Sequence, residues 1–264
     1  EGRFSFINQI DRYNNQKDGD NHSVYTLNGR EKQYQAFLYY KYFYSNPKPL
    51  IVTEGKTDAR YIKSALKNLW KEYPQLVEKK QNGAFQFKFA VLHKTERLAY
   101  FMGIAQDGAD TMKNIYSYYN DDRNKQFPNY YCTLSKLRVP SDQQPVILLF
   151  DNEMCTGKKP LSHFVNHIKL ETSAKTKLKS DLYVRLLSES NLYLMTVPLV
   201  DGKDECEIED LFQPQTREHK IGDRTLCLKD KYDPSKHYGK DEFSNYIVQN
   251  YASIDFTGFR KLLD

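Results

Sequence analysis

Residues 49–58 read PLIVTEGKTD and residues 145–153 read PVILLFDNE. Each stretch is a short apolar run that ends abruptly on acidic side chains. A short apolar run bounded by polar residues is typical of a strand buried on both faces, as in a parallel sheet. The two stretches therefore predict buried strands at residues 49–53 and 145–150, each followed at its carboxyl end by carboxylates.

The residues around these two strands alternate between helical and strand periodicity. Residues 58–71 carry apolar side chains at the spacing of an amphipathic helix. Further helices are predicted at residues 30–44, 108–119, 159–170 and 241–251, and further strands at residues 85–92 and 192–198. Because strands that alternate with helices form parallel sheets covered on both faces, we predict an α/β fold with a mostly parallel sheet flanked by helices.

The N-terminal part departs from this alternation. Residues 1–16 have helical periodicity, and residues 46–49 read NPKP, a sequence that ends the helix predicted before it. We therefore place a domain boundary after residue 46. An N-terminal helical extension occupies residues 1–46, and the main domain occupies residues 47–264.

The composition bounds the class of protein. The chain has 264 residues, a formal net charge of +5 and four cysteines without CxxC spacing. The mild positive charge is compatible with a polyanionic partner, and the cysteine spacing argues against a zinc site or a disulfide framework. No apolar run is long enough to span a bilayer, so we expect no membrane association. The aromatic run YYKYFY at residues 39–44 is more typical of packing in a core or a partner interface than of base stacking.

The first residues, EGRF, have neither an initiator Met nor the features of a signal peptide. We therefore expect a cytoplasmic protein with reduced cysteines. We also expect that either a start was processed away or the chain belongs to a longer polypeptide.

Glu54 and Asp58 flank a predicted turn after the first buried strand. Glu54 falls at the carboxyl end of that strand, where open α/β sheets bind ligands, and Gly55 permits a tight turn into the next helix. Asp58 begins this helix, where exposed amide groups favour a carboxylate. Each acid has a simpler alternative role, as a helix cap for Asp58 and as a solvated loop residue for Glu54.

Asp151 and Glu153 follow the second buried strand two residues apart, so in extended geometry they point to the same side. Converging carboxylates repel each other unless a cation lies between them, and oxygen ligands favour Mg²⁺ or Mn²⁺. The pair therefore predicts a metal site, and a Glu-Gly turn after an earlier strand strengthens that prediction.

Glu207 and Glu209 lie in a third acidic stretch, residues 201–212, after the strand predicted at residues 192–198. Their alternation would project both side chains to one face. An acidic loop that leads into a helix explains the stretch equally well, so the role of these two residues stays open.

The two strand-end motifs resemble those of the Toprim domain, the catalytic domain shared by type IA and type II topoisomerases, bacterial primases and nucleases of the overcoming-lysogenisation-defect type. That family has a Glu-Gly motif after its first strand and a DxD motif after a later one. By this match Glu54 corresponds to the catalytic Glu, Asp151 to the first metal-binding Asp, and Asp58 to an additional acid of the nuclease branch. Glu153 stands where the family usually has Asp, so the charge is kept and the metal position shifts. The resemblance spans residues 48–212.

This resemblance implies a Mg²⁺-dependent (or Mn²⁺-dependent) endonuclease that cleaves phosphodiester bonds in RNA or DNA. Glu54, Asp151 and Glu153 would be catalytic and, with Asp58, would hold one or two metal ions. Whether Glu54 is a ligand or a general acid or base stays open. The alternative is a catalytically inactive Toprim module that binds nucleic acid or a partner, and Glu153 in place of Asp keeps that alternative in view.

The N-terminal stretch GRFSFINQIDRYN, residues 2–14, resembles the segment that closes the thumb of bacterial retron reverse transcriptases. Some of these enzymes carry a C-terminal Toprim extension, which acts as a toxic effector of anti-phage defence restrained by the reverse transcriptase and its RNA-linked DNA. The resemblance implies that residues 1–46 are the tail of an upstream reverse transcriptase domain and residues 47–264 its nuclease effector. The nucleic-acid target, the trigger and the oligomeric state stay open, and a homo-oligomer is among the assemblies allowed.

Other enzyme classes fit the sequence less well. A topoisomerase needs a strand-passage tyrosine on a separate large domain, and a primase usually brings a zinc module. No P-loop or GxGxxG sequence follows a predicted strand. The segment at residues 157–159, GKK, is a candidate phosphate-binding loop or, more simply, a basic surface loop.

Overall fold

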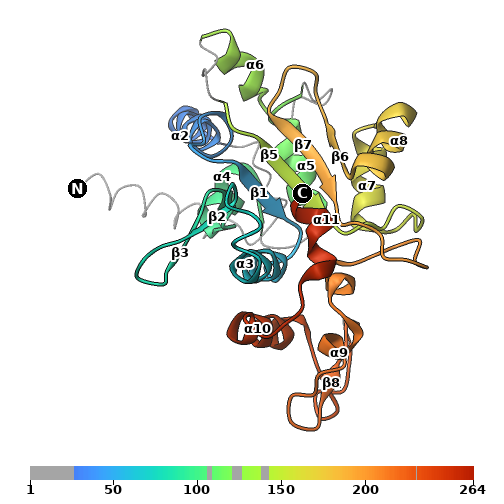
Figure 1. Ribbon diagram of the computed structural model, residues 1–264. Coiled ribbons are helices and arrows are strands. Elements are labelled where there is room, and N and C mark those ends of the chain that lie inside the picture. The colour runs from blue at the N-terminus through green and yellow to red at the C-terminus, as the bar shows by residue number, and fades with distance from the viewer. Residues whose placement is uncertain (1–26, 106–108, 121–126, 138–142, 230) are drawn as a thin grey trace.

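The computed structural model describes residues 27–105, 109–120, 127–137, 143–229 and 231–264. Its centre is a five-stranded sheet (Figure 1). In spatial order the strands are β4 (Ala90–Val91), β1 (Leu50–Thr53), β5 (Val146–Phe150), β7 (Leu192–Thr196) and β6 (Tyr183–Arg185). The first four strands run parallel, and β6 pairs antiparallel with β7 at the edge. The predicted α/β class with a mostly parallel sheet is therefore confirmed.

Helices surround this sheet. The α-helices are α2 (Gly29–Tyr39), α3 (Asp58–Asn68), α4 (Glu96–Met102), α5 (Ala109–Ser117), α6 (Tyr130–Ser135), α7 (Pro160–His167), α8 (Thr172–Asp181), α9 (Pro214–Arg217), α10 (Lys240–Asn250) and α11 (Arg260–Leu263). A π-helix, η2 (Tyr40–Tyr44), extends α2, and two 3₁₀ turns are η3 (Ile208–Leu211) and η4 (Thr257–Phe259). Two small sheets pair β2 (Val77–Lys79) with β3 (Phe85–Phe87) and β8 (Thr225–Leu226) with β9 (His237–Tyr238). In the described residues, no helix has both the length and the apolar character of a membrane span.

The two faces of the sheet belong to two separate hydrophobic clusters, because successive side chains of a strand point to opposite faces. Val52 and Leu148 pack into the cluster formed with α2, α4, α5 and α7. Ile51 and Leu149 face the cluster formed with α3, α10 and η4. Strand β5 is thus apolar throughout and β1 is apolar up to its last residue, Thr53, because helices approach both faces, as predicted from their sequences.

Strands β1, β5 and β7 and helices α3, α5, α7 and α10 lie where the sequence predicts them. The single strand predicted at residues 85–92 is wrong, because this stretch changes partners along its length. Its first half pairs with β2 in a hairpin, and its second half joins β1 in the main sheet. The helix predicted at residues 1–16 lies outside the described residues.

Helix α2 and the π-helix share the core of the main sheet. Tyr39 and Phe43 are fully buried in the same cluster as Val52. The Nδ2 group of Asn191 donates to the backbone oxygen of Phe43 at 3.0 Å and to that of Gln144 at 2.6 Å. Core packing is therefore confirmed for Tyr39, Phe43 and Tyr44, whereas Tyr40 is exposed. Among the described residues, the segment before the boundary predicted after residue 46 shares its core with the main sheet and has no separate core of its own.

Gly258 in η4 provides a test of how the C-terminal segment packs. A Cβ atom at this position would collide with the backbone carbonyl oxygen of Leu211, whereas a Cβ on Gly29 has open space around it. Gly258→Ala is expected to lower the free energy of unfolding by about 2 kcal/mol or more, since a backbone must move to relieve the overlap. Urea unfolding of this variant beside Gly29→Ala measures the effect, and equal midpoints for the two variants would contradict the close approach.

Candidate active site

The carboxyl ends of β1 and β5 deliver the predicted acids to one edge of the sheet. Residue Thr53 of β1 pairs with Leu149 of β5, so the two strands end nearly level. Glu54 directly follows β1 and Asp151 directly follows β5. Open α/β sheets bind their ligands at this edge. The sheet topology therefore places both acids where a site is expected.

A short backbone bridge brings the third acidic stretch to the same edge. Asn152 and Cys206 exchange two backbone hydrogen bonds of 2.8 and 3.0 Å. The Nδ2 group of Asn152 also donates to the backbone oxygen of Val197 at 2.9 Å. Two residues beyond the bridge, the backbone N–H of Ile208 donates to the Asp151 carboxylate at 2.8 Å. The turn η3, which carries Glu209, is therefore held directly against the end of β5.

Asp58 closes the turn between β1 and α3. Its carboxylate accepts a hydrogen bond of 2.9 Å from the backbone N–H of Gly55 and a longer one, 3.4 Å, from the Thr57 hydroxyl. A Cβ atom on Gly55 would lie only 3.3 Å from Asp58 Oδ1, so a glycine suits this close approach. Asp58 thus caps the turn and also lies among the other acids, as their pKa values show.

Burial of the acids close together raises the pKa of several of them. Burial, then repulsion from Asp58 and Glu153, raises the pKa of Glu54 from 4.5 to about 7. Burial, then repulsion from Asp58 and Glu209, raises the pKa of Asp151 well above its usual value. Burial is also the main cause of the raised pKa of Glu209, about 7, although nearby Lys240 opposes that increase. These mutual effects show that acids from three chain segments form one electrostatic cluster.

Lys240, the first residue of α10, places a positive charge within this cluster. Its ammonium nitrogen lies 3.0 Å from Glu207 Oε2 and 3.2 Å from Glu209 Oε2. Although burial disfavours its charge, attraction to Glu209, Glu207 and Asp151 raises the pKa of Lys240. Both acids of the third stretch therefore project toward one cation. Glu207 also caps the 3₁₀ turn η3, so the stretch is at the same time an acidic loop that leads into a helical turn.

Glu153 has a different partner from Asp151. It is buried and forms an ion pair with Lys159, which belongs to the basic segment after the acidic pair. It also raises the pKa of Glu54, after burial and Asp58. A second lysine, Lys94, donates to the backbone oxygen of Glu54 at 2.8 Å. Lysines thus contact the cluster from three separate segments.

The donor chemistry of the cluster suits a hard divalent cation, since every candidate ligand is a carboxylate oxygen. Glu209 Oε1 is buried and has no hydrogen-bond partner among the described residues. However, no group of three His, Cys, Asp or Glu side chains in the described ranges stands close enough together to hold a metal. The residues Glu54, Asp58, Asp151 and Glu153 nevertheless fit a metal by type.

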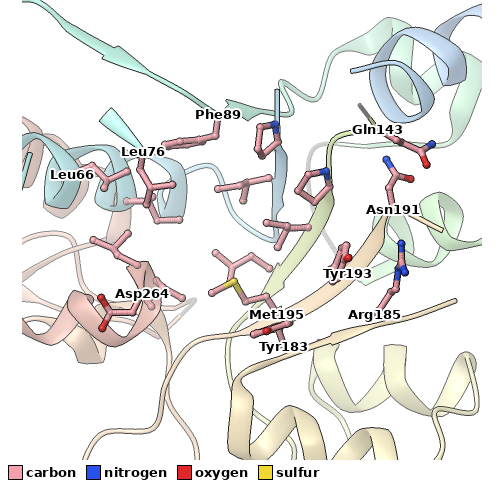
Figure 2. Close-up of a pocket in the computed structure, with 18 residues that line it drawn as sticks. Leu66, Leu76, Phe89, Gln143, Tyr183, Arg185, Asn191, Tyr193, Met195 and Asp264 are labelled. Carbon is pink, nitrogen blue, oxygen red and sulfur yellow. The ribbon is translucent and has the colours of Figure 1, made fainter. Parts of the chain in front are cut away.

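A cavity of about 580 Å³ lies elsewhere, on the face of the sheet beside α3 and α11 (Figure 2). Its walls are mostly apolar side chains such as Leu66, Leu76, Phe89 and Met195. None of the clustered carboxylates lines it. Acid-base or metal-dependent chemistry needs the clustered carboxylates, and these lie outside the cavity. The acidic edge of the sheet, and not this cavity, is therefore the candidate active site.

Sequence reasoning left out Lys240 and assigned no role to Glu209. Lys240 lies far along the chain from every acidic motif, and one lysine at the start of a helix is an ordinary feature of sequences. Glu209 carries a clearer signal, because it alternates with Glu207 after a predicted strand. Only the fold shows that these residues meet Asp151.

No protein-family model matches this chain, and no solved structure matches it significantly.

The raised pKa of Glu54 predicts how stability depends on pH. The folded protein binds this proton more tightly than the unfolded chain does. The cost of burying the charge is therefore absent below about pH 4.5 and grows until about pH 7. Glu54→Gln has no charge to bury, so at pH 8 it should be more stable than wild type by on the order of 1–3 kcal/mol.

Urea unfolding without divalent metal checks this expectation. At pH 4.5 the two proteins should have nearly equal stability. The matched variant Glu78→Gln changes an exposed glutamate on β2 and should differ little from wild type at either pH. A wild type at least as stable as Glu54→Gln at pH 8 would refute the burial cost.

Proposed function

We propose that this chain is a Toprim-type, metal-dependent endonuclease that cleaves phosphodiester bonds in RNA or DNA. The observation that carries the proposal is the convergence of Glu54, Asp58, Asp151 and Glu209 at the carboxyl edge of a parallel sheet, with mutually raised pKa values. A purely structural edge gains nothing from burying like charges together, whereas a metal-dependent active site requires them. The strand-end motifs that resemble the Toprim family give the same interpretation.

Glu54, Asp58, Asp151 and Glu153 would hold one or two Mg²⁺ or Mn²⁺ ions. When bound, the metal supplies Lewis-acid polarisation of the phosphate and lowers the pKa of a bound water. Glu54 acts either as a ligand or as the general acid or base. Lys240 supplies positive charge beside the carboxylates, where it favours the approach of an anionic phosphate.

The biological setting that we propose is anti-phage defence in the cytoplasm. Residues 1–46 would connect the nuclease to an upstream reverse transcriptase, whose domain and RNA-linked DNA restrain it until infection. This part of the proposal is supported only by the resemblance of residues 2–14 to the thumb segment of retron reverse transcriptases.

A second candidate function is a catalytically inactive module that binds nucleic acid or a partner. One observation favours it. The ion pair with Lys159 engages Glu153 and leaves that carboxylate compensated without a metal. The two functions differ in whether divalent metal binds and whether nucleic acid is cut.

Metal binding is the first test. Calorimetric titration with Mg²⁺ or Mn²⁺ should show binding to the wild type and none to the double variant Asp151→Asn with Glu153→Gln, since both lose carboxylate charge. At a metal concentration about one hundred times Kd, the bound ion should stabilise the fold by about 2.7 kcal/mol. The control is Glu171→Gln with Glu189→Gln, two exposed glutamates. Equal binding by all three proteins would remove these acids from the metal site.

Cleavage is the second test. Glu54→Gln keeps the size and hydrogen bonding of the side chain and removes its charge. Loss of a general acid or base costs roughly a hundredfold to ten-thousandfold in rate. We therefore expect at least that loss when wild type and variant are incubated with labelled tRNA, single-stranded DNA and duplex DNA plus Mg²⁺, with Glu78→Gln as the matched control.

Two outcomes of this assay count against the proposal. If Glu54→Gln cuts as fast as wild type, the mechanism assigned to this residue is wrong. If neither protein cuts any substrate, including after release from a reverse transcriptase partner, the binding-module function is favoured instead.

A further inference from the structure

Lysines and aromatic rings alternate on one surface of α3, the β2–β3 hairpin and the end of α10. Each ammonium group of this surface lies over at least one ring. The members of this basic-aromatic surface are Lys63, Lys67, Trp70, Lys71, Lys79, Phe85, Phe87 and Tyr251. All of their side chains are partly or fully accessible to solvent.

Direct contacts join six of the eight members into one continuous patch, and the other two, Lys63 and Phe87, contact each other and share α3 and β3 with it. The ammonium group of Lys79 lies 5.8 Å from the Trp70 ring and 5.5 Å from the Phe85 ring. The Phe85 ring in turn lies 6.1 Å from that of Tyr251. Lys67 is 5.3 Å from the Tyr251 ring, so the patch passes from the hairpin to α3 without a break.

The positive charge of this surface is uncompensated. Within the described residues, none of its four lysines forms an ion pair with a carboxylate. By contrast, the neighbouring Lys56 and Arg60 both pair with Asp241. Glu78 lies on β2, and alternation of side chains directs it away from the face that carries Lys79.

The surface is held in place by hydrogen bonds behind it. The Nδ2 group of Asn68 donates to the backbone oxygens of Tyr251 at 2.9 Å and Ile254 at 3.2 Å, which fixes the end of α10 against α3. Lys48 donates to the backbone oxygen of Phe87 at 3.1 Å, which ties the hairpin to the start of β1. A ligand would therefore meet a largely preformed surface.

Helix α3 connects this surface to the acidic cluster, because its first residue is Asp58. Lys63 and Lys67 are four residues apart and so share one face of the helix. At ~1.5 Å of rise per residue, Lys67 lies roughly 14 Å along the axis from Asp58. A stacked strand at ~3.4 Å per nucleotide would cover that distance with about four nucleotides.

We propose that the basic-aromatic surface binds single-stranded nucleic acid and leads it to the acidic cluster. Phosphates contact the lysine ammonium groups, each of which has three N–H donors, and unpaired bases stack against the rings. Bases in a duplex already stack on each other, so single strands are the favoured ligand. The inference rests on the proposed function in taking nucleic acid as the substrate.

Binding is measured without metal, so that it does not depend on cleavage. Fluorescence anisotropy of a labelled single strand, in EDTA, should show Lys67→Glu with Lys71→Glu binding about tenfold or more weakly than wild type. The magnitude of the log–log salt slope should fall by about 0.7 for each phosphate that the variant no longer neutralises. The charge-matched control, Lys177→Glu with Lys179→Glu, alters exposed lysines of α8 and should bind as wild type does.

The chain has a single tryptophan, Trp70, so its intrinsic tryptophan fluorescence reports on this surface alone. Titration with an unlabelled single strand should quench that fluorescence, whereas inorganic polyphosphate, which has no bases, should quench it less. Circular dichroism of each variant excludes unfolding as the cause of weak binding.

Three outcomes would overturn the inference: equal binding by both double variants, tighter binding of a duplex than of the single strand, or stronger binding to anionic vesicles than to nucleic acid. The proposed nuclease function can fail independently of this inference. If wild type binds through this surface and cuts nothing with Mg²⁺, the inference stands and the nuclease assignment does not.

Discussion

The parallel pairing of β1 with β5 is the constraint on which the acidic site depends. Parallel strands end at the same edge, and the register that sets Thr53 against Leu149 makes Glu54 and Asp151 neighbours across that edge. A slip of one residue would turn each side chain to the opposite face and disrupt the packing of both hydrophobic clusters. Because both faces are packed, burial of the core and alignment of the acids follow from the same register.

The acidic edge opposes the stability that this core provides. Buried carboxylates that raise one another's pKa disfavour the folded state at neutral pH. Lys240 offsets part of that repulsion through its ion pairs with Glu207 and Glu209. The backbone N–H groups of Gly55 and Ile208 also offset part of it, because they donate hydrogen bonds to Asp58 and Asp151. Functional sites commonly retain such repulsion, because their chemistry needs charged groups that a stable core would exclude.

The fold and the site were predictable from the sequence to different degrees. Long apolar or amphipathic stretches, such as those of β5 and α3, report local burial, so their type and place follow from the residues alone. The hairpin of β2 and β3 escaped prediction because nothing local shows that the stretch from Phe85 to Val91 exchanges one partner strand for another. Such exchanges depend on tertiary pairing.

The same distinction applies to the site, where Glu54 and Asp151 were predictable because each directly follows a buried strand. The position of Glu209 depends on the bridge between Asn152 and Cys206, and that of Lys240 on the packing of α10 against α3. Long-range contacts therefore decide which residues complete a site whose first members are visible locally.

The placement of α10 has a consequence for how the protein matures on the ribosome. Tyr61 and Leu66 of α3 pack with Phe243, Phe256 and other residues translated much later, so this half of the core assembles only when that segment has emerged. A nascent chain that stops before α10 carries the acidic residues without their lysine and leaves α3 with an uncovered apolar face. Such dependence on distant contacts slows folding and delays completion of the site. For a nuclease of the proposed kind, the site would therefore be complete only after α10 has left the ribosome and packed against α3.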